Sequence, residues 1–323
     1  MATRFRAIFP DIRSQSWTVT IDDPDYVGAV VEVDCIGGFK LRHQGEGKGM
    51  YNYIMGSSLA FSIAVSATTR TALETFQVDL IDIPEGTLSI KVVRGSDLYW
   101  IGYIMPDLCK FDDKEDAFEF NVTAVDGLAK LKGVDYKDTS GLTDRPYTAL
   151  SFLEHILNCL NESGLSTLYF NPTTDIFLRT VVNWVDATMG APAAVKDPLR
   201  YSRVSGEVFA KRKETAAEDY DFFSCYEVLK QICIHWKARL LFSNGCYRFE
   251  QIDERRQDTF YERRWSSDMT LISSDNNMQY DRTVNQTINA ARLAGGQYGY
   301  LPALYKMKVK YDHKTYKNHA QNL

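Results

Sequence analysis

The chain has 323 residues and a formal net charge of −5 at pH 7. This length is enough for one large domain or about two to three ordinary ones. With 45% hydrophobic and 24% charged residues, the composition is that of a globular protein, which excludes a wholly disordered chain. The 19 Tyr and 17 Phe favour β-structure, and the mild acidity argues against a dedicated duplex-DNA binder.

The sequence predicts neither a transmembrane helix nor an export signal. It contains no apolar stretch of about 18 residues, and no apolar run follows Arg4 and Arg6. The cysteines are scattered without a CxxC pair, so we interpret them as reduced thiols of a chain that is assembled in a cytosol. They are Cys35, Cys109, Cys159, Cys225, Cys233 and Cys246.

Alternation of apolar and polar residues predicts short strands throughout residues 1–138. The alternating or β-rich runs are residues 17–22, 27–36, 59–65, 76–81, 88–92, 98–104 and 118–124. About seven short strands at this spacing predict a β-sandwich or a small β-barrel rather than a βαβ fold. Such a domain should contain no helix longer than about three turns in residues 50–125. The glycine-rich residues 37–49 are expected to form a hairpin loop.

Asp126 and Gly127 are predicted to make a sharp exit from the last of these strands. Gly127 would take a positive φ, which glycine tolerates without steric cost. Leu128 and Leu131 would then pack back on the barrel. On this interpretation, Gly127→Val impairs folding.

Helical spacing begins near residue 140. The elements predicted after this point are helices over residues 148–162 and 224–237 and strands over residues 239–243 and 246–250. Gly164 is a plausible stop for the first helix, and Asn244-Gly245 between the two strands is a strong hairpin signal. Together these elements predict an α+β domain over residues 139–265.

The remaining residues, 266–323, are predicted to form a polar arm and a C-terminal strand. Residues 273–299 are rich in Ser, Asn, Gln and Gly, and residues 305–311 alternate apolar residues with lysine. The lysines on the shared face are Lys306, Lys308 and Lys310. Either this strand completes an earlier sheet, or the natural chain continues beyond it. The preceding residues 251–265 are dense in charges of both signs.

Charge is unevenly distributed along the chain. Residues 74–138 contain 14 acidic and 7 basic residues, a net charge of −7, whereas residues 301–323 contain 5 Lys and 1 Asp, a net charge of +4. Such a separation suggests surfaces that meet different partners. Ordinary solvated surfaces explain it equally well.

Three motifs suggest a bound phosphate or metal, and each fails on spacing. A P-loop needs Gly where Arg42 stands and Ser or Thr where Gly49 stands. The acidic residues 112–116 lack the Gly and Glu positions of an EF-hand, so we interpret them as a solvated turn. A third group matches no zinc pattern, and core thiols explain it better. This group is Cys225, Cys233, His235 and Cys246.

No catalytic motif is recognisable either. HExxH and GxSxG are absent, His155 beside Glu154 is typical of a helical surface, and no single pair of carboxylates stands out. We therefore predict that the protein is not an enzyme and has no catalytic, cofactor-binding or metal-binding residues.

Several fragments carry a family resemblance. They are Met55-Gly-Ser-Ser-Leu-Ala-Phe61, Leu98-Tyr-Trp-Ile-Gly-Tyr-Ile104, Phe118-Glu-Phe-Asn-Val-Thr-Ala-Val-Asp-Gly-Leu-Ala-Lys-Leu-Lys132, Glu227-Val-Leu-Lys-Gln-Ile232 and Ala238-Arg-Leu-Leu-Phe-Ser-Asn-Gly-Cys-Tyr-Arg-Phe249. In these fragments, spread over residues 15–250, the chain resembles the baseplate hub and tail-tip hub proteins of tailed phages and prophages. The resemblance is strongest to those of phages that infect Bacteroidota.

The resemblance implies a structural hub protein of a phage tail baseplate or tail tip. It implies a tube-protein-like small β-barrel followed by an α+β module, and a homotrimer that closes the tail tube and links it to the spike or central fibre. The implied partners are a distal tail or tail tube protein ring and a spike, central fibre or tape measure protein. DNA would pass through the lumen without specific binding. The protein would be part of the virion, at the tail tip or baseplate, after assembly in the host cytoplasm.

The family places two barrels in each chain, so that a trimer meets a hexameric tube. Only one barrel, residues 1–138, is evident in this sequence, unless residues 266–323 belong to a further hub domain. In a trimeric ring, the acidic residues 74–138 would contribute to an inner, DNA-facing wall. The lysine-faced residues 306–310 would lie outside the lumen, where they would not trap phosphates; alternatively, they are simply a solvated edge strand.

Two other classes of protein stay open. One is a tail-associated cell-wall-degrading protein whose catalytic part lies outside this chain. The other is a carbohydrate-binding β-module for host recognition, which would bind sugar through exposed aromatic side chains. Tyr99, Trp100 and Tyr103 lie on one predicted strand and suit either a core or an obligate interface.

Overall fold

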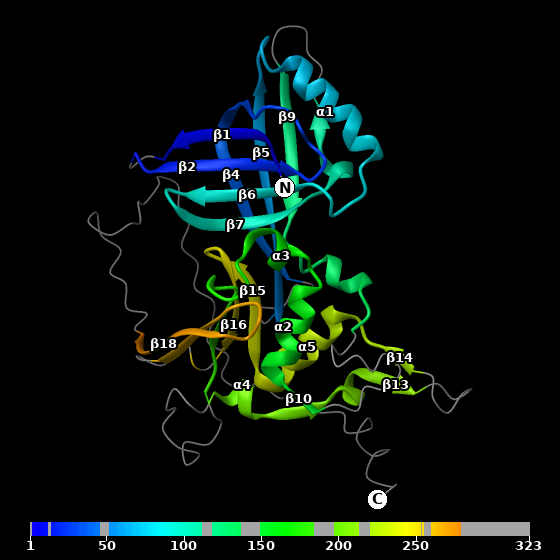
Figure 1. Ribbon diagram of the computed structural model, residues 1–323, viewed down its shortest axis with the longest axis vertical. Coiled ribbons are helices and arrows are strands. Elements are labelled where there is room, and N and C mark those ends of the chain that lie inside the picture. The colour runs from blue at the N-terminus through cyan, green and yellow to red at the C-terminus, as the bar shows by residue number, and fades with distance from the viewer. Residues whose placement is uncertain are drawn as a thin grey trace, which may run out of the picture. The chain divides into compact units, whose positions relative to one another are not determined.

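A computed structural model describes part of the chain. The described residues are 2–11, 14–45, 52–111, 118–136, 149–183, 197–212, 220–252, 254 and 260–278. All of them belong to one compact unit, residues 1–280, and a second unit comprises residues 281–323. Strands dominate the described residues and a few helices accompany them, which confirms the predicted mainly β fold with α+β character (Figure 1). In this part of the chain, no helix is long and apolar enough to cross a membrane.

The N-terminal strands form a closed β-barrel. Antiparallel pairing follows the order β1 (Ala2–Pro10), β2 (Ser16–Asp23), β6 (Ser89–Arg94), β7 (Asp97–Ile104), β9 (Phe118–Val125), β5 (Ile54–Val65) and β4 (Asp34–Gly45). The short strand β3 (Val31–Glu32) precedes β4 by one residue and runs parallel to β1. The N–H of Val33 donates to the carbonyl of Arg6 at 2.9 Å. The segment of β3 and β4 therefore joins both ends of the series, and the sheet closes on itself.

Alternation along these strands explains the barrel core. Inward positions carry apolar side chains that are almost completely buried, among them Phe5, Ile21, Ile90, Trp100 and Phe120. In Figure 1, β1, β2, β6 and β7 lie side by side and cross the direction of β5 and β9. Each side chain on the inner face of the barrel is removed from water on folding, which is the main stabilising contribution.

Helix α1 (Arg70–Asp82) corrects the prediction of a strand over residues 76–81. Leu73, Phe76 and Leu80 are buried because they share one helical face, and Phe76 packs edge-on against Phe5 with ring centroids 5.1 Å apart. Phe76, Val78 and Leu80 are spaced by two residues, which fits a strand. However, Phe76 and Leu80 are also four residues apart, which fits one face of a helix. The helix has 13 residues, so the expectation of no helix beyond about three turns in this region is wrong. The barrel closes with α1 packed on it.

The predicted loop over residues 37–49 is also wrong where the structure describes it. Strand β4 continues to Gly45 and pairs with β5. Gly37 and Gly38 have φ values of 68° and 72°, and the register shifts between Ile36 and Phe39. The two glycines form a β-bulge inside the strand rather than a loop. Strand β1 was not predicted at all.

The second part of the described chain is an α+β module. Its main helices are α2 (Phe152–Asn161) and α5 (Cys225–Trp236). Its sheet has the order β18 (Leu271–Met278), β17 (Phe260–Trp265), β11 (Leu178–Val181), β16 (Cys246–Gln251) and β15 (Ala238–Ser243). Asn244 and Gly245 take φ values of 50° and 76° between β15 and β16, so the predicted hairpin is confirmed. Ser151 caps α2 in a capping box with Glu154, and Ser224 caps α5.

Short elements complete the described residues. They are β8 (Lys110–Phe111), β10 (Ala149–Ser151), β12 (Arg203–Ser205), β13 (Ala210–Arg212), β14 (Tyr220–Phe222), α3 (Leu165–Tyr169), α4 (Pro198–Tyr201) and 3-10 helices at Pro106–Leu108, Lys130–Gly133 and Gly206–Phe209.

Strand β5 belongs to both the barrel and the module. Ile54 and Met55 pair in parallel with Leu240 and Leu241 of β15, which joins the barrel and the module sheet into one 14-stranded sheet. Strand β18 lies inside the stretch that was predicted to be a polar arm. The domain boundaries 1–138, 139–265 and 266–323 stay a prediction. Residues 112–116 and the lysine-faced residues 305–311 lie outside the described residues.

Candidate functional site

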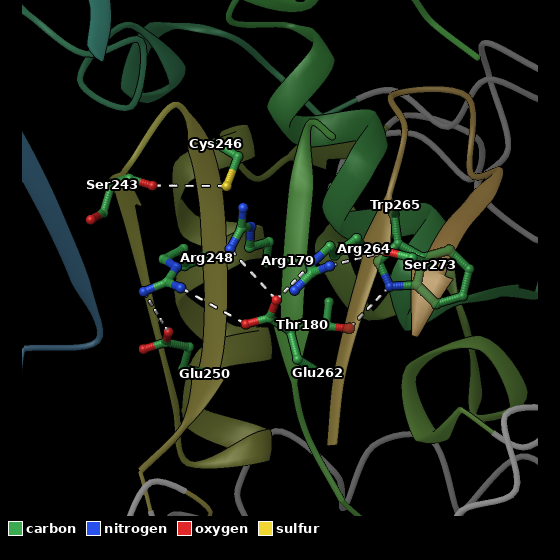
Figure 2. Close-up of polar contacts among 10 residues, drawn as sticks. All are labelled: Arg179, Thr180, Ser243, Cys246, Arg248, Glu250, Glu262, Arg264, Trp265 and Ser273. Atoms are coloured by element: carbon green, nitrogen blue, oxygen red, sulfur yellow. Dashed lines mark hydrogen bonds and ion pairs between the residues drawn. The ribbon is translucent and has the colours of Figure 1, made fainter. Parts of the chain in front are cut away.

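A layer of charged side chains covers one face of the module sheet (Figure 2). Alternation along β16 buries Tyr247 and Phe249 on the opposite face. The register places Arg179 of β11 beside Arg248 of β16 and Arg264 of β17. The charged layer is therefore set by strand pairing. Its members are Arg179, Arg248, Glu250, Glu262 and Arg264.

The arginines of the layer converge on Glu262, whose side chain is only 1% exposed. The Nε of Arg264 donates to its Oε1 at 2.7 Å, and the guanidinium groups of Arg179 and Arg248 lie 3.5 Å and 3.8 Å from its carboxylate oxygens. Figure 2 shows these three groups pointing toward this carboxylate. Arg248 also lies 3.5 Å from Glu250, which is equally buried. A carboxylate this deep in the fold is tolerated because cations surround it.

The layer has a chemical consequence for the surface. Its three arginines and two glutamates leave one excess positive charge, and the arginine side chains are 15–26% exposed whereas the glutamate side chains are 1–2% exposed. The exposed edge of the layer is therefore cationic. On the other face of β17, Arg263 forms a buried ion pair with Asp197 at 3.1 Å. Burial raises the pKa of Asp197, and Arg263 opposes this shift.

Sequence reasoning did not identify this layer. Residues 251–265 are predicted from sequence only to be a region of mixed charge, because charged residues usually occupy solvent-exposed positions. The signal in the sequence is the pair of aromatic residues Phe260 and Trp265, which stand on either side of residues 261–264. Both are 1% exposed.

A second buried polar group lies where β5 and β9 meet the module. The carboxylate of Asp126 accepts hydrogen bonds from the N–H of Ser57 at 2.5 Å, the hydroxyl of Ser57 at 2.7 Å and the N–H of Leu128 at 3.2 Å. The Nε1 of Trp100 donates to the same hydroxyl at 2.8 Å. Burial raises the pKa of Asp126 to about 6, although these hydrogen bonds favour its charged form. These hydrogen bonds fix the direction in which the chain leaves β9.

Gly127 is required at this exit for a reason other than the predicted one. Its φ is not positive. A Cβ at this position would lie 2.7 Å from the Cβ of Ser163, so the residue must be glycine for the close approach to the module. The carbonyl of Ser163 accepts from the hydroxyl of Tyr103 at 2.8 Å, and burial raises the pKa of Tyr103 to about 12. Leu128 and Leu131 are buried.

The junction between barrel and module contains further direct hydrogen bonds. Tyr169 donates to Asp22 at 2.9 Å, and the N–H of Gly245 donates to the carbonyl of Tyr99 at 2.8 Å. A Cβ on Gly245 would approach the carbonyl oxygen of Leu98 to 2.2 Å. The turn of the β15–β16 hairpin therefore sits directly against β7.

Of the residues that were weighed as possible ligands, the cysteines are part of the core, whereas His235 is exposed. Cys225, Cys233 and Cys246 are buried free thiols, and His235 stacks on Phe152 with ring centroids 5.1 Å apart. Among the described residues, no group of three or more His, Cys, Asp or Glu side chains is placed to hold a metal ion. His155 does not lie on a helical surface as predicted. It is fully buried, and its ring contacts the hydroxyl of Tyr136 and the carbonyl of Val204.

Comparison with known proteins gives partial structural similarities. No protein-family model and no curated protein matches the chain. One similar crystal structure is the 43 kDa tail protein of prophage MuSo2 from Shewanella oneidensis, with 12% identity and a TM-score of 0.34, over 66% of this chain and 53% of that chain. Another is the tail protein from Neisseria meningitidis MC58, with 10% identity and a TM-score of 0.32, over 66% of this chain and 50% of that chain. This chain thus spans about half the length of these two structures, and both are tail proteins.

Proposed function

We propose that the chain is a structural hub subunit of a phage tail, located in the virion at the tail tip or baseplate. In this proposal, three copies form a ring that closes the tail tube and links it to the spike or central fibre. The observation that carries the proposal is the closed β-barrel with an α+β module fixed to it, which is the architecture implied by the sequence resemblance.

The mechanical demands on a hub support this assignment. A subunit that transmits load between a tube and a fibre needs domains that do not swing against each other. Here β5 runs through both the barrel and the module sheet, and the hydrogen bonds of Tyr103 and Tyr169 link the two parts. The buried charged side chains of the module form ion pairs with one another rather than surround a cavity. These features favour a structural role over a catalytic one.

The proposed partners are a distal tail or tail tube protein ring on one side and a spike, central fibre or tape measure protein on the other. DNA would pass through the lumen without specific binding. Exposed carboxylates of the acidic residues 74–138, such as Asp97 and Glu119, suit such a wall because they repel phosphates. Asp126 does not contribute to it, since it is buried.

Native mass spectrometry of the purified full chain tests the proposal. A mass of three chains, or of a multiple of three, is the expected result, together with antibody labelling at the tail tip in electron micrographs of the source particle. A monomer at all concentrations, or label elsewhere on the particle, would overturn it. A permanent ring should bury more than about 1,000 Å² at each contact.

A carbohydrate-binding module is the second candidate, and one observation favours it. Trp17, Phe39 and Tyr99 form a half-buried aromatic cluster on the barrel, with Trp17 4.9 Å from Tyr99 and 5.2 Å from Phe39 between ring centroids. Partly exposed aromatic rings are common sugar platforms. A monomer that binds glycans and loses this binding in Trp17→Ala would support this candidate. Trp100 takes no part in it, because it is fully buried.

A further inference from the structure

The C-terminal half of α1 exposes apolar side chains although its other face is packed on the barrel. Val78 is 62% exposed and Ile81 is 79% exposed. Next to them, Val27 is fully exposed at the edge of one hollow and Leu108 is 47% exposed in the turn after β7. Single exposed apolar residues are common, but several that gather on one surface indicate an interaction site.

Two hollows flank this half of α1 and meet at Ile83. One has a volume of about 420 Å³ and is lined by Ile81, Pro106 and Phe120, among others. The other has a volume of about 580 Å³ and is lined by Val27 and Val78, among others. Apolar side chains of a partner could enter both hollows while its main chain lies across the end of the helix. We name the surface formed by both hollows and Ile81 the α1 surface.

The α1 surface has an acidic rim. Asp82, Glu85 and Asp107 line its hollows, are exposed, and have no ion-pair partner in the described part of the chain. Asp79 is already paired with Arg4. A partner for this surface should therefore combine apolar side chains with cations at short spacing.

We propose that the α1 surface binds the lysine-bearing residues 305–311 of a second copy of the chain. This segment reads Tyr-Lys-Met-Lys-Val-Lys-Tyr, so apolar side chains and lysines alternate through it. Its apolar side chains match the hollows, and its lysines match the unpaired carboxylates of the rim, to which exposed Asp25 of the second hollow also belongs. The contact joins neighbouring subunits of the ring, and it therefore rests on the proposed function. It also assigns the α1 carboxylates to a subunit contact rather than to the lumen.

Charge reversal on both sides tests the contact. Asp82→Lys with Glu85→Lys should weaken assembly of the full chain, raising the dissociation constant by at least about tenfold, and Lys306→Glu with Lys308→Glu should do the same. The chain that carries all four substitutions should recover assembly to within about threefold of the wild type. Glu74→Lys is a matched control on α1 away from the hollows, and Lys314→Glu with Lys317→Glu is the control for the segment. Sedimentation velocity measures assembly, and circular dichroism checks that each variant folds.

The apolar part of the surface has its own test. Ile81→Ser with Val78→Ser removes exposed side chains, so folding should be unchanged while assembly weakens by at least about tenfold. If the wild type does not assemble into three copies or a multiple of three, the proposed function fails. If the trimer forms and these variants assemble like the wild type, only the present inference fails. If both reversals weaken assembly and their combination does not restore it, the α1 surface binds something other than residues 305–311, which also overturns the inference.

Discussion

The barrel and the module bury their strands in different ways. Inward positions of the barrel are mostly apolar, and its most deeply buried carboxylate, Asp126, is held by hydrogen bonds without a cation, although Asp23 forms a buried pair with Arg4 at 3.2 Å. The module sheet instead buries Glu250 and Glu262 beneath arginines. The stability of the barrel therefore depends mostly on how closely its side chains pack and how much apolar surface they bury. The stability of the module also depends on the balance between its buried carboxylates and arginines. The following predictions test this contrast, from the largest effect to the smallest.

Glu262→Gln should have the largest effect. The change removes the charge that three arginines share, and it leaves cations in a poorly solvated place. We expect the free energy of unfolding to fall by about 3–5 kcal/mol, measured by urea denaturation. Glu74→Gln is the control, because Glu74 forms a 3.8 Å pair with Arg70 in which both side chains are about half exposed. Its loss should be about 0.5 kcal/mol or less. Equal losses of unfolding free energy in the two variants would contradict the contrast between the barrel and the module.

Asp126 should make the barrel sensitive to pH in a defined window. Its pKa is raised from 3.8 to about 6, so the folded state favours the neutral acid. Its contribution to stability is fully present below about pH 4 and is lost as the pH rises to about 6, by about 3 kcal/mol in total. Asp126→Asn cannot titrate. The difference in unfolding free energy between the wild type and this variant should therefore change across pH 4–6, and a flat difference would refute the prediction.

Gly127→Ala should destabilise the junction by about 1–3 kcal/mol, because the new methyl group meets the Cβ of Ser163 at 2.7 Å. Gly127→Val should be worse. Gly133→Ala is a matched control, since a Cβ there has no neighbour within 4 Å and its φ is not positive. Thermal unfolding of both alanine variants measures the effect. Equal melting temperatures would mean that the close approach at Gly127 has no energetic importance.

The smallest predicted effect is stabilising. Lys237 ends α5 in a left-handed conformation with φ 49°, which glycine adopts more easily. Lys237→Gly should raise the free energy of unfolding by about 0.5 kcal/mol, measured by urea denaturation. Lys230→Gly, inside the same helix, should lower it by about 1 kcal/mol. A loss of stability in both variants would show that the Lys237 side chain outweighs its strained backbone.

Local patterns predicted much of the barrel and of the α5–β15–β16 unit. Alternation identified β2, β6, β7 and β9, since one face of each strand is buried. It failed for α1, because Phe76 and Leu80 fit two periodicities and only packing decides between them. It also failed for β4, because Gly37 and Gly38 suggest a loop and form a bulge when β5 lies alongside.

The polar groups of the fold were less predictable, because their partners are distant in sequence. Glu262 is tolerated inside the fold only because Arg179 and Arg248 come from two other strands. The need for glycine at position 127 comes from Ser163, 36 residues further along the chain. No local pattern encodes such contacts, and both would have required the tertiary structure.

A high-resolution cryo-electron microscopy map of the assembled tail tip is the most direct test of the central claim. We predict three copies of the chain, or a multiple of three, arranged with their barrels around the tube axis, and Lys306, Lys308 and Lys310 away from the channel. A copy number that is not divisible by three, or these lysines lining the channel, would contradict the proposed hub.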